Sequence, residues 1–181
     1  MYQIIKQILR TGIKTETPPQ PDDALRSQIQ EINAQILHHV GRALAIRHVD
    51  AGSCNGCELE IHCLNNAYYN IDGLGIHFVA SPRHADMLLV TGPVSRHMEI
   101  ALKRTYDATP DPKLVVAIGD CGCDGGIFSP TNALGDKCES YANCGKIANV
   151  IPVDVTVLGC PPTPVAILQG ILTAVSNRKT G

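Results

Sequence analysis

The chain has 181 residues and a formal net charge of −2 at pH 7, and its 44% hydrophobic content is typical of a globular protein and too low for a membrane bundle. This length suits one well-cored domain with an appended arm, and no apolar run approaches the roughly 20 residues needed to cross a bilayer. The small net charge, the absence of Trp and the presence of only two Phe argue against nucleic acid as a partner.

The first 42 residues are predicted to form a helical arm and linker ahead of a domain that spans residues 43–181. Over residues 1–14, aliphatic side chains recur at helical spacing with basic ones between them, which predicts a helix with one apolar and one basic side. Such a helix packs on a neighbouring subunit, the interpretation favoured here, or lies on a membrane surface. The proline-rich residues 16–21 indicate an extended linker, and a second helix is expected over residues 22–40.

Short apolar segments then alternate with helical patterns. The predicted strands cover residues 44–49, 76–80, 87–91, 114–118 and 153–158. The predicted helices begin after Cys57 and cover residues 96–106 and 163–175. Short continuous apolar strands between helices indicate an α/β fold, with a parallel sheet covered by helices on both faces. Residues 132–149, rich in Gly, Asn and charge, are expected to form a surface excursion.

Eight cysteines are many for a chain in which we find no signal peptide, and in a reducing compartment such thiols are metal ligands or catalysts more often than disulfides. Three cysteine-bearing loops each follow a predicted strand. They contain Cys54 and Cys57, then Cys121, and finally Cys160. Loops at the carboxyl ends of parallel strands meet in one crevice, so these thiols are expected to converge.

Four converging thiolates are what a [4Fe-4S] cluster needs. Structural zinc usually draws on two local pairs of ligands, and here only Cys54 and Cys57 form a pair, so the spacing favours iron–sulfur over a zinc-bound scaffold. A Cys-x-x-Cys between a strand and a helix is also the redox arrangement of thioredoxins, which makes a thiol–disulfide oxidoreductase the alternative from another class. Cys123 is the rival of Cys121 for the third ligand position, although two residues on an extended segment point oppositely.

Cys63, Cys138 and Cys144 are not expected to be cluster ligands. Cys63 lies about two turns into the predicted helix and is expected to be a buried small hydrophobe. Cys138 and Cys144 lie in the predicted surface excursion. They are interpreted as bystanders, with a reversible disulfide or ligation of an additional group as alternatives.

Two groups of ionisable residues also stand out. Glu58 and Glu60 flank the first cysteine loop, where they form either a solvated helix N-terminus or a proton-handling site coupled to electron arrival. Residues 81–86 contain Arg83, His84 and Asp86. These three form either a salt-bridged structural corner or a contact with a redox partner or cofactor.

Five separated motifs occur in order along the chain: SCNGCELE at residues 53–60, SPRHAD at 81–86, TGPV at 91–94, GDC at 119–121 with GG at 125–126, and GCPPTP at 159–164. Together they resemble the cluster-bearing small subunit that respiratory complex I, as its 20 kDa subunit, shares with membrane-bound [NiFe] hydrogenases. The resemblance runs from about residue 43 to residue 175, which is most of the chain.

This resemblance implies a flavodoxin-like fold without bound flavin and a single [4Fe-4S] cluster. The implied ligands are Cys54, Cys57, Cys121 and Cys160. Glu60 matches the acid that follows the cysteine motif in quinone-reducing relatives, which suggests proton handling there. Complex I versions carry adjacent cysteines where this chain has Cys-Asn-Gly-Cys, a departure that resembles the energy-converting (group 4) hydrogenases such as formate hydrogenlyase.

The resemblance therefore implies an electron-transfer subunit of a membrane-bound oxidoreductase complex. It would relay electrons from a ferredoxin-like subunit to a [NiFe] active site in a large subunit. The alternative is the equivalent cluster subunit of a quinone-reducing, complex-I-like NADH dehydrogenase. Membrane subunits are further expected partners, and the expected location is cytoplasmic, peripheral on the inner face of the cell membrane.

Overall fold

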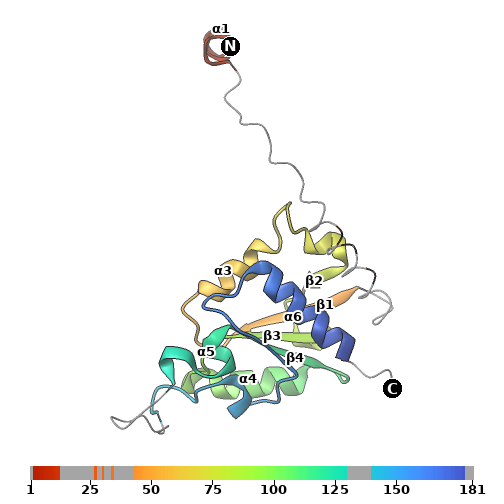
Figure 1. The fold of residues 1–181 in the computed structure, drawn as a ribbon, viewed down its shortest axis with the longest axis vertical. Coiled ribbons are helices and arrows are strands. Elements are labelled where there is room, and N and C mark those ends of the chain that lie inside the picture. The colour runs from red at the N-terminus through yellow and green to blue at the C-terminus, as the bar shows by residue number, and fades with distance from the viewer. Residues whose placement is uncertain are drawn as a thin grey trace.

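Five short strands form one parallel sheet (Figure 1). The structure is a computed structural model that describes residues 2–12, 27, 30, 34, 43–129 and 140–177. The strands are β1 (Leu44–Asp50), β2 (Ile76–Phe78), β3 (Met87–Thr91), β4 (Leu114–Ile118) and β5 (Val155–Val157). Their order, β2-β1-β3-β4-β5, is that of flavodoxin-like folds. The predicted fold class is confirmed, and the strand order reverses between β1 and β3.

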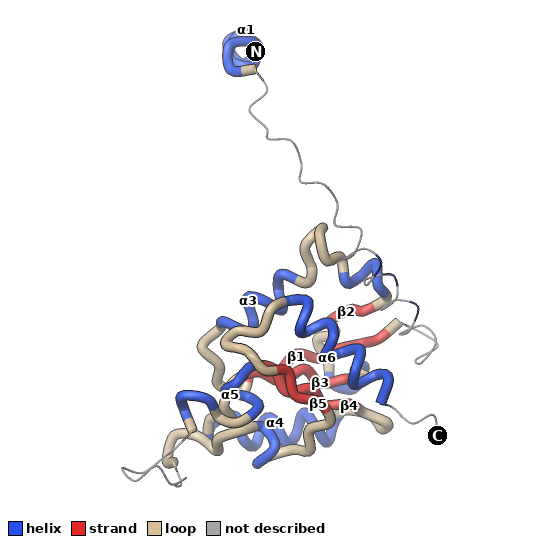
Figure 2. The backbone as a smooth tube through the Cα atoms, in the orientation of Figure 1, coloured by secondary structure: helices blue, strands red, loops and turns tan. Residues whose placement is uncertain are grey.

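Helices cover both faces of this sheet, as Figures 1 and 2 show. α3 (Gly56–Cys63) and α6 (Pro164–Asn177) pack on one face. α4 (Arg96–Ala108) packs on the other. Alternate residues of β3 enter the two cores, and all five of its residues are buried. Burial on both faces explains why the strands are continuous apolar runs rather than alternating ones.

Several short helical elements lie between the strands. They are η1 (Ile71–Leu74), η2 (Pro82–His84), α5 (Gly119–Cys123), η3 (Gly126–Phe128) and η4 (Ile147–Asn149). α5 differs from the extended loop predicted after β4, because β4 runs directly into a helical turn. On a helix, residues two apart are still about 200° apart around the axis, so Cys121 and Cys123 point to different sides as expected.

Two predictions about burial were wrong. Cys63 is exposed at the end of α3. The buried positions of that helix are Glu58 and Ile61, and Cys63 falls on another side of it. The supposed surface excursion also contributes to the core, because Ile147 is fully buried against the face that α4 covers.

The N-terminal helix is confirmed as α1 (Tyr2–Thr11), and none of its residues is buried. Within the part of the chain that the structure describes, no helix is both long and apolar enough to cross a membrane. The linker at residues 16–21 and Cys138 lie outside the described residues. So does the helix predicted over residues 22–40, apart from the helical Ser27, Gln30 and Ala34.

Candidate metal centre

The three cysteine loops meet at the carboxyl edge of the sheet, after β1, β4 and β5. A Cβ built on Gly119, which follows β4, would lie 2.6 Å from the Cys57 Sγ and 3.5 Å from the Gly159 carbonyl oxygen. One built on Gly56 would lie 3.6 Å from the Cys54 Sγ and 3.9 Å from the Pro161 ring. Loops far apart in sequence are therefore in van der Waals contact, as the parallel topology predicts.

Two of the four predicted ligand thiols have a raised pKa. Burial, which is the largest cause, and the negative charges of Glu58, Cys54, Cys121 and Cys160 together raise the pKa of the Cys57 thiol to about 12. Burial also raises the pKa of Cys121, with Cys160 and Cys54 as the next contributors. Thiolates gathered in this way repel one another, and a bound cationic centre would stabilise them. No group of three or more His, Cys, Asp or Glu among the described residues is arranged to hold a metal ion.

Glycines leave room for two of these sulfurs. Gly119 has a φ of +82°, and its Cβ would occupy the space of the Cys57 sulfur. Gly126 has a φ of +47°, and its Cβ would lie 3.1 Å from both the backbone nitrogen and the Sγ of Cys121. Both positions combine a left-handed backbone with close approach to a thiol, a combination that only glycine accepts without strain.

Aspartates that the sequence reasoning did not single out hold the loops in place. The Asp50 Oδ1, at the end of β1, accepts hydrogen bonds from the backbone N–H groups of Gly52 and Ser53, both at 2.8 Å. The Asp120 Oδ1 accepts one from the Gly159 N–H at 2.7 Å, and the Asp120 N–H donates to the Gly159 carbonyl at 3.0 Å. The second pair ties the loop after β4 to the loop after β5. An aspartate at a strand end next to small residues is the signal that could have identified them.

The two cysteines of α5 have different surroundings. Cys121 is electrostatically coupled to Cys160 and Cys54. The Cys123 thiol instead donates hydrogen bonds to two carbonyl oxygens, that of Ala117 at 3.6 Å and that of Val157 at 3.5 Å. Burial raises the pKa of Cys123 to about 11. The charges of the other candidate ligands therefore act on Cys121, whereas the Cys123 thiol is hydrogen-bonded to strand carbonyls.

Glu58 is the unexpected residue of the site. It is only 5% exposed, so the interpretation of a solvated helix N-terminus was wrong for this acid. Its Oε1 lies 3.7 Å from the His48 Nε2, and neither carboxylate oxygen has a hydrogen-bond partner. His48 also lies within 3.1 Å of the Thr91 Oγ1, and burial lowers its pKa, although Glu58 opposes the shift. Glu60, two residues further along α3, is partly exposed.

A small cavity adjoins this buried pair. Its volume is about 230 Å³, and its lining includes His48 and His62 together with Arg47, whose buried Nε has no hydrogen-bond partner. Ile61 and Phe78 close its apolar side. His48 therefore connects the two features, because it lines the cavity and lies beside the buried Glu58 carboxylate.

The loop at residues 81–86 lies at the opposite, amino edge of the sheet. The Asp86 carboxylate accepts a hydrogen bond from the Ala45 N–H at 3.1 Å. Its backbone carbonyl accepts one from the Leu114 N–H, so Asp86 connects β1 with β4. Asp86 thus has a structural role, which these hydrogen bonds to the backbone of neighbouring strands provide. Arg83 and His84 are exposed and line a cavity of about 380 Å³.

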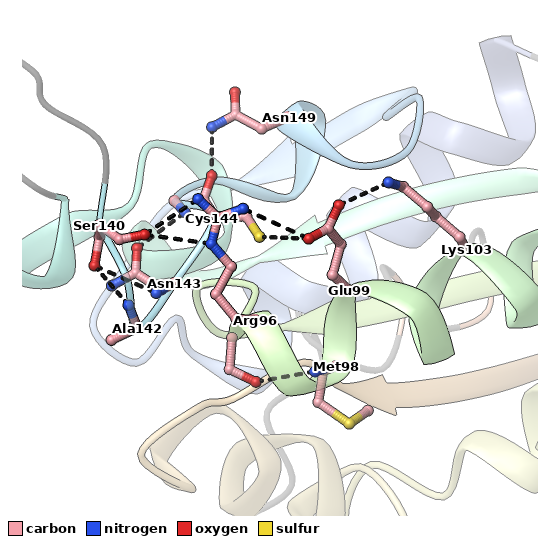
Figure 3. A network of polar contacts seen from close by, with 11 residues as sticks. Arg96, Met98, Glu99, Lys103, Ser140, Ala142, Asn143, Cys144 and Asn149 are labelled. Atoms are coloured by element: carbon pink, nitrogen blue, oxygen red, sulfur yellow. Dashed lines mark hydrogen bonds and ion pairs between the residues drawn. The ribbon is translucent and has the colours of Figure 1, made fainter.

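Residues 140–149, here called the strap, are fixed to the start of α4 (Figure 3). The Arg96 guanidinium donates to the Ser140 carbonyl at 3.1 and 3.3 Å. The Cys144 thiol donates to the Glu99 carboxylate at 3.3 Å, and Lys103 donates to the same acid at 2.7 Å. Burial raises the pKa of Cys144, and the bond to Glu99 adds to the shift. Cys144 is thus a half-buried anchor of the strap, in keeping with its interpretation as a bystander.

Comparison with known proteins gives a consistent set of relatives. The family model described as NADH ubiquinone oxidoreductase, 20 kDa subunit, matches residues 54–174. A probable membrane-bound hydrogenase subunit, mbhJ, of Pyrococcus furiosus is 44% identical over 152 residues, covering 84% of this chain and 86% of that protein. Formate hydrogenlyase subunit 7 of Escherichia coli is 40% identical over 81% of this chain, which spans only 54% of the relative. An NADH-quinone oxidoreductase subunit of Desulfovibrio desulfuricans is 41% identical over 73% of this chain and 66% of that protein.

Solved structures agree with these relatives. A chain of the membrane-bound sulfane sulfur reductase, an archaeal respiratory membrane complex, superposes with a TM-score of 0.61 at 32% identity, covering 79% of this chain and 77% of that one. A chain of the NAD+-reducing [NiFe]-hydrogenase superposes with a TM-score of 0.57, covering 77% and 95%. Its 17% identity shows a shared fold only.

Proposed function

This chain belongs to the family of the NADH:ubiquinone oxidoreductase 20 kDa subunit, and on that premise we propose that it is the electron-transfer subunit of a membrane-bound hydrogenase complex, carrying one [4Fe-4S] cluster. Its relatives are subunits of oxidoreductase complexes, and it is a subunit of such an enzyme. The finer proposal concerns the cluster, its ligands and its position in the electron path.

The residues at the carboxyl edge of the sheet fit the proposed cluster. Cys54, Cys57, Cys121 and Cys160 supply four thiolates, the ligand set of this cluster type. When bound, the cluster supplies one-electron transfer at a potential that its surroundings tune. Asp50 and Asp120 hold the loops that present these thiols. The observation that carries the proposal is the contact between the three cysteine loops at one sheet edge: a Cβ on Gly119 would meet the Cys57 sulfur and the Gly159 carbonyl, and one on Gly56 would meet the Cys54 sulfur and Pro161.

The thiol–disulfide oxidoreductase alternative leaves two cysteines without a role. That chemistry needs only the two thiols of a Cys-x-x-Cys motif. Here the loops that carry Cys121 and Cys160 also pack against the loop of Cys54 and Cys57, through Gly119 and Pro161. A four-cysteine metal site uses all of these thiols.

The hydrogenase assignment rests on the Cys-Asn-Gly-Cys spacing and on the mbhJ relative, which aligns over most of both chains. The equivalent subunit of a quinone-reducing complex is the second candidate, favoured by the 41% identity to the Desulfovibrio protein. Proton handling at Glu60 stays part of the proposal and rests on the family resemblance. Glu58, which is buried beside Cys57, is a second acid for that role.

The surroundings of the thiols support docking of a partner there. Exposed aliphatic side chains follow the same three strands along the chain: Leu59 in α3 is 59% exposed, Ile127 in η3 is 88% exposed, and Leu158 directly after β5 is 66% exposed. Exposed apolar groups gathered at one edge are typical of a protein interface. The proposed partners are a large subunit with the active site, a ferredoxin-like subunit and membrane subunits. Residues 43–181 would form the cluster domain and residues 1–42 the arm, at the inner face of the cell membrane.

The test is the metal content of the full chain purified without oxygen. About four irons per chain and a broad visible absorbance bleached by dithionite are expected for one cluster. Cys54→Ala and Cys160→Ala should lose that iron, and Cys63→Ala is the matched control because its thiol is exposed on another side of α3. Stoichiometric zinc in a colourless protein would overturn the proposal.

A second pair of variants tests the third ligand. Cys121→Ala should lose the iron, whereas Cys123→Ala should keep it, because the Cys123 thiol is hydrogen-bonded to strand carbonyls. The reverse result would assign the third position to Cys123. The sequence of the associated large subunit separates the two candidate functions: paired Cys-x-x-Cys motifs near both of its ends would indicate a [NiFe] centre, and their absence a quinone site.

A further inference from the structure

α1 has one completely apolar side and one completely polar side. Successive residues of a helix are about 100° apart around its axis. At this spacing Tyr2, Ile4, Ile5, Ile8 and Leu9 share one side of α1, and its polar residues share the other: Gln3, Lys6, Gln7, Arg10 and Thr11. The apolar side is uncovered, because Ile4 and Ile8 are each 63% exposed and Leu9 is 79% exposed.

The charge of α1 differs in sign from that of the whole chain. Lys6 and Arg10 are its charged residues, and α1 contains no acid. The chain as a whole carries a formal net charge of −2. Basic charge is therefore concentrated on the polar side of this helix, where it complements an anionic surface.

We propose that α1 is an interfacial helix that lies on an anionic lipid surface. Ile4, Ile5, Ile8 and Leu9 would enter the boundary of the acyl chains, and Lys6 and Arg10 would reach lipid phosphates. Tyr2 and Lys6, one turn apart, border the two sides at the position where aromatic and basic side chains meet headgroups. Ten residues span only about 15 Å as a helix, so α1 lies along the surface and does not cross it.

The acid-free polar side favours lipid as the partner, in place of the neighbouring subunit that the sequence pattern alone favoured. A neighbouring protein would cover the apolar side equally well, but it would leave the polar side in water, where mixed charges are usual. This inference extends the proposed membrane association by assigning it to a segment of this chain. It does not depend on the cluster.

The absence of Trp from the chain allows a fluorescence test without background. Ile8→Trp places a single reporter on the apolar side of α1 in the full chain, and Gln7→Trp places a matched one on the polar side. With vesicles of phosphatidylcholine and phosphatidylglycerol, Ile8→Trp emission should shift to the blue and be quenched by brominated acyl chains. Gln7→Trp emission should change little.

Reversing the charge of α1 is the second part of the test. The double variant Lys6→Glu/Arg10→Glu should bind the anionic vesicles at least about tenfold more weakly than the unmodified chain, and added salt should weaken the unmodified chain in the same direction. A chain that does not sediment with anionic vesicles at low salt would overturn the proposal. So would an Ile8→Trp shift that appears only when partner subunits are added. Iron content, measured in the same samples, reports separately on the proposed cluster.

Discussion

Gly119→Ala is the sharpest test of the site, because the missing side chain of Gly119 is the space in which the Cys57 sulfur lies. An alanine Cβ there would stand 2.6 Å from the Cys57 Sγ. To reach an ordinary contact of about 3.5–4.0 Å, the sulfur must move by roughly 1 Å. A functional site tolerates displacements of only about 0.5 Å, so the proposed cluster should be lost.

Gly75→Ala is the matched control for backbone strain. Gly75 has a φ of +74°, close to the +82° of Gly119, but the nearest atom to its Cβ position is 4.0 Å away. Alanine in this left-handed conformation costs about 1–2 kcal/mol. For a chain of this length that cost corresponds to a fall of roughly 2–8 °C in Tm. Both variants should show this fall in Tm, but only Gly119→Ala should also have a steric clash, with the Cys57 sulfur.

The assay combines iron content with thermal unfolding followed by circular dichroism, on protein purified without oxygen. Gly75→Ala should unfold at a lower temperature and retain its iron. Gly119→Ala should show at least the same fall and lose most of its iron. Equal iron in the two variants would refute the reasoning, because it would mean that the position of the Cys57 sulfur does not matter for metal binding.

Three further predictions concern the surroundings of the site. Burial lowers the pKa of His48 in the folded chain, so at mildly acidic pH the unfolded chain binds a proton at His48 more readily than the folded chain does. The free energy of unfolding should therefore fall as the pH drops below about 6.5. In urea titrations at several pH values, His48→Gln should make this fall smaller. The negative charge of Glu99 and its hydrogen bond both help to raise the pKa of Cys144. Glu99→Gln removes the charge and weakens the hydrogen bond, so alkylation of Cys144 at pH 8, measured by mass spectrometry, should become faster. An unchanged alkylation rate would count against the contact between Cys144 and Glu99. A Cβ on Gly170 would stand 2.2 Å from the Val157 Cγ2; Gly170→Ala should therefore cost about 1–3 kcal/mol of stability, and Val157→Ala in the same chain should recover part of it.

The strands could be predicted from the sequence because burial on both faces demands continuous apolar runs. The predicted bounds of β3 and β4 agree with the structure, and all ten of their residues are buried. The position of the three cysteine loops followed from the same pattern, since parallel strands place the following loops at one edge. Membership of the family was likewise apparent from motifs that are short and local.

Side-chain environments were harder to predict. Cys63 was expected to be buried and is exposed, because an α3 of only eight residues buries a narrow side that contains Glu58 and Ile61. Glu58 was expected to be solvated, and only the packing of α3 against β1 places it beside His48. Residues 132–149 were expected to form a surface excursion, yet Ile147 is fully buried. Polarity and spacing alone do not predict such cases.

The sequence by itself therefore determined how the strands and the longer helices follow one another along the chain, and which loops carry the thiols. These features depend on apolar periodicity and small-residue motifs, which involve only a few neighbouring residues. Only the tertiary structure decided that the charges of Cys54 and Cys160 act on Cys121 while Cys123 donates to the carbonyls of β4 and β5. It also decided that an acid is buried next to Cys57. The reason is geometric: the burial and contacts of a helical side chain depend on which distant segments pack against its side of the helix.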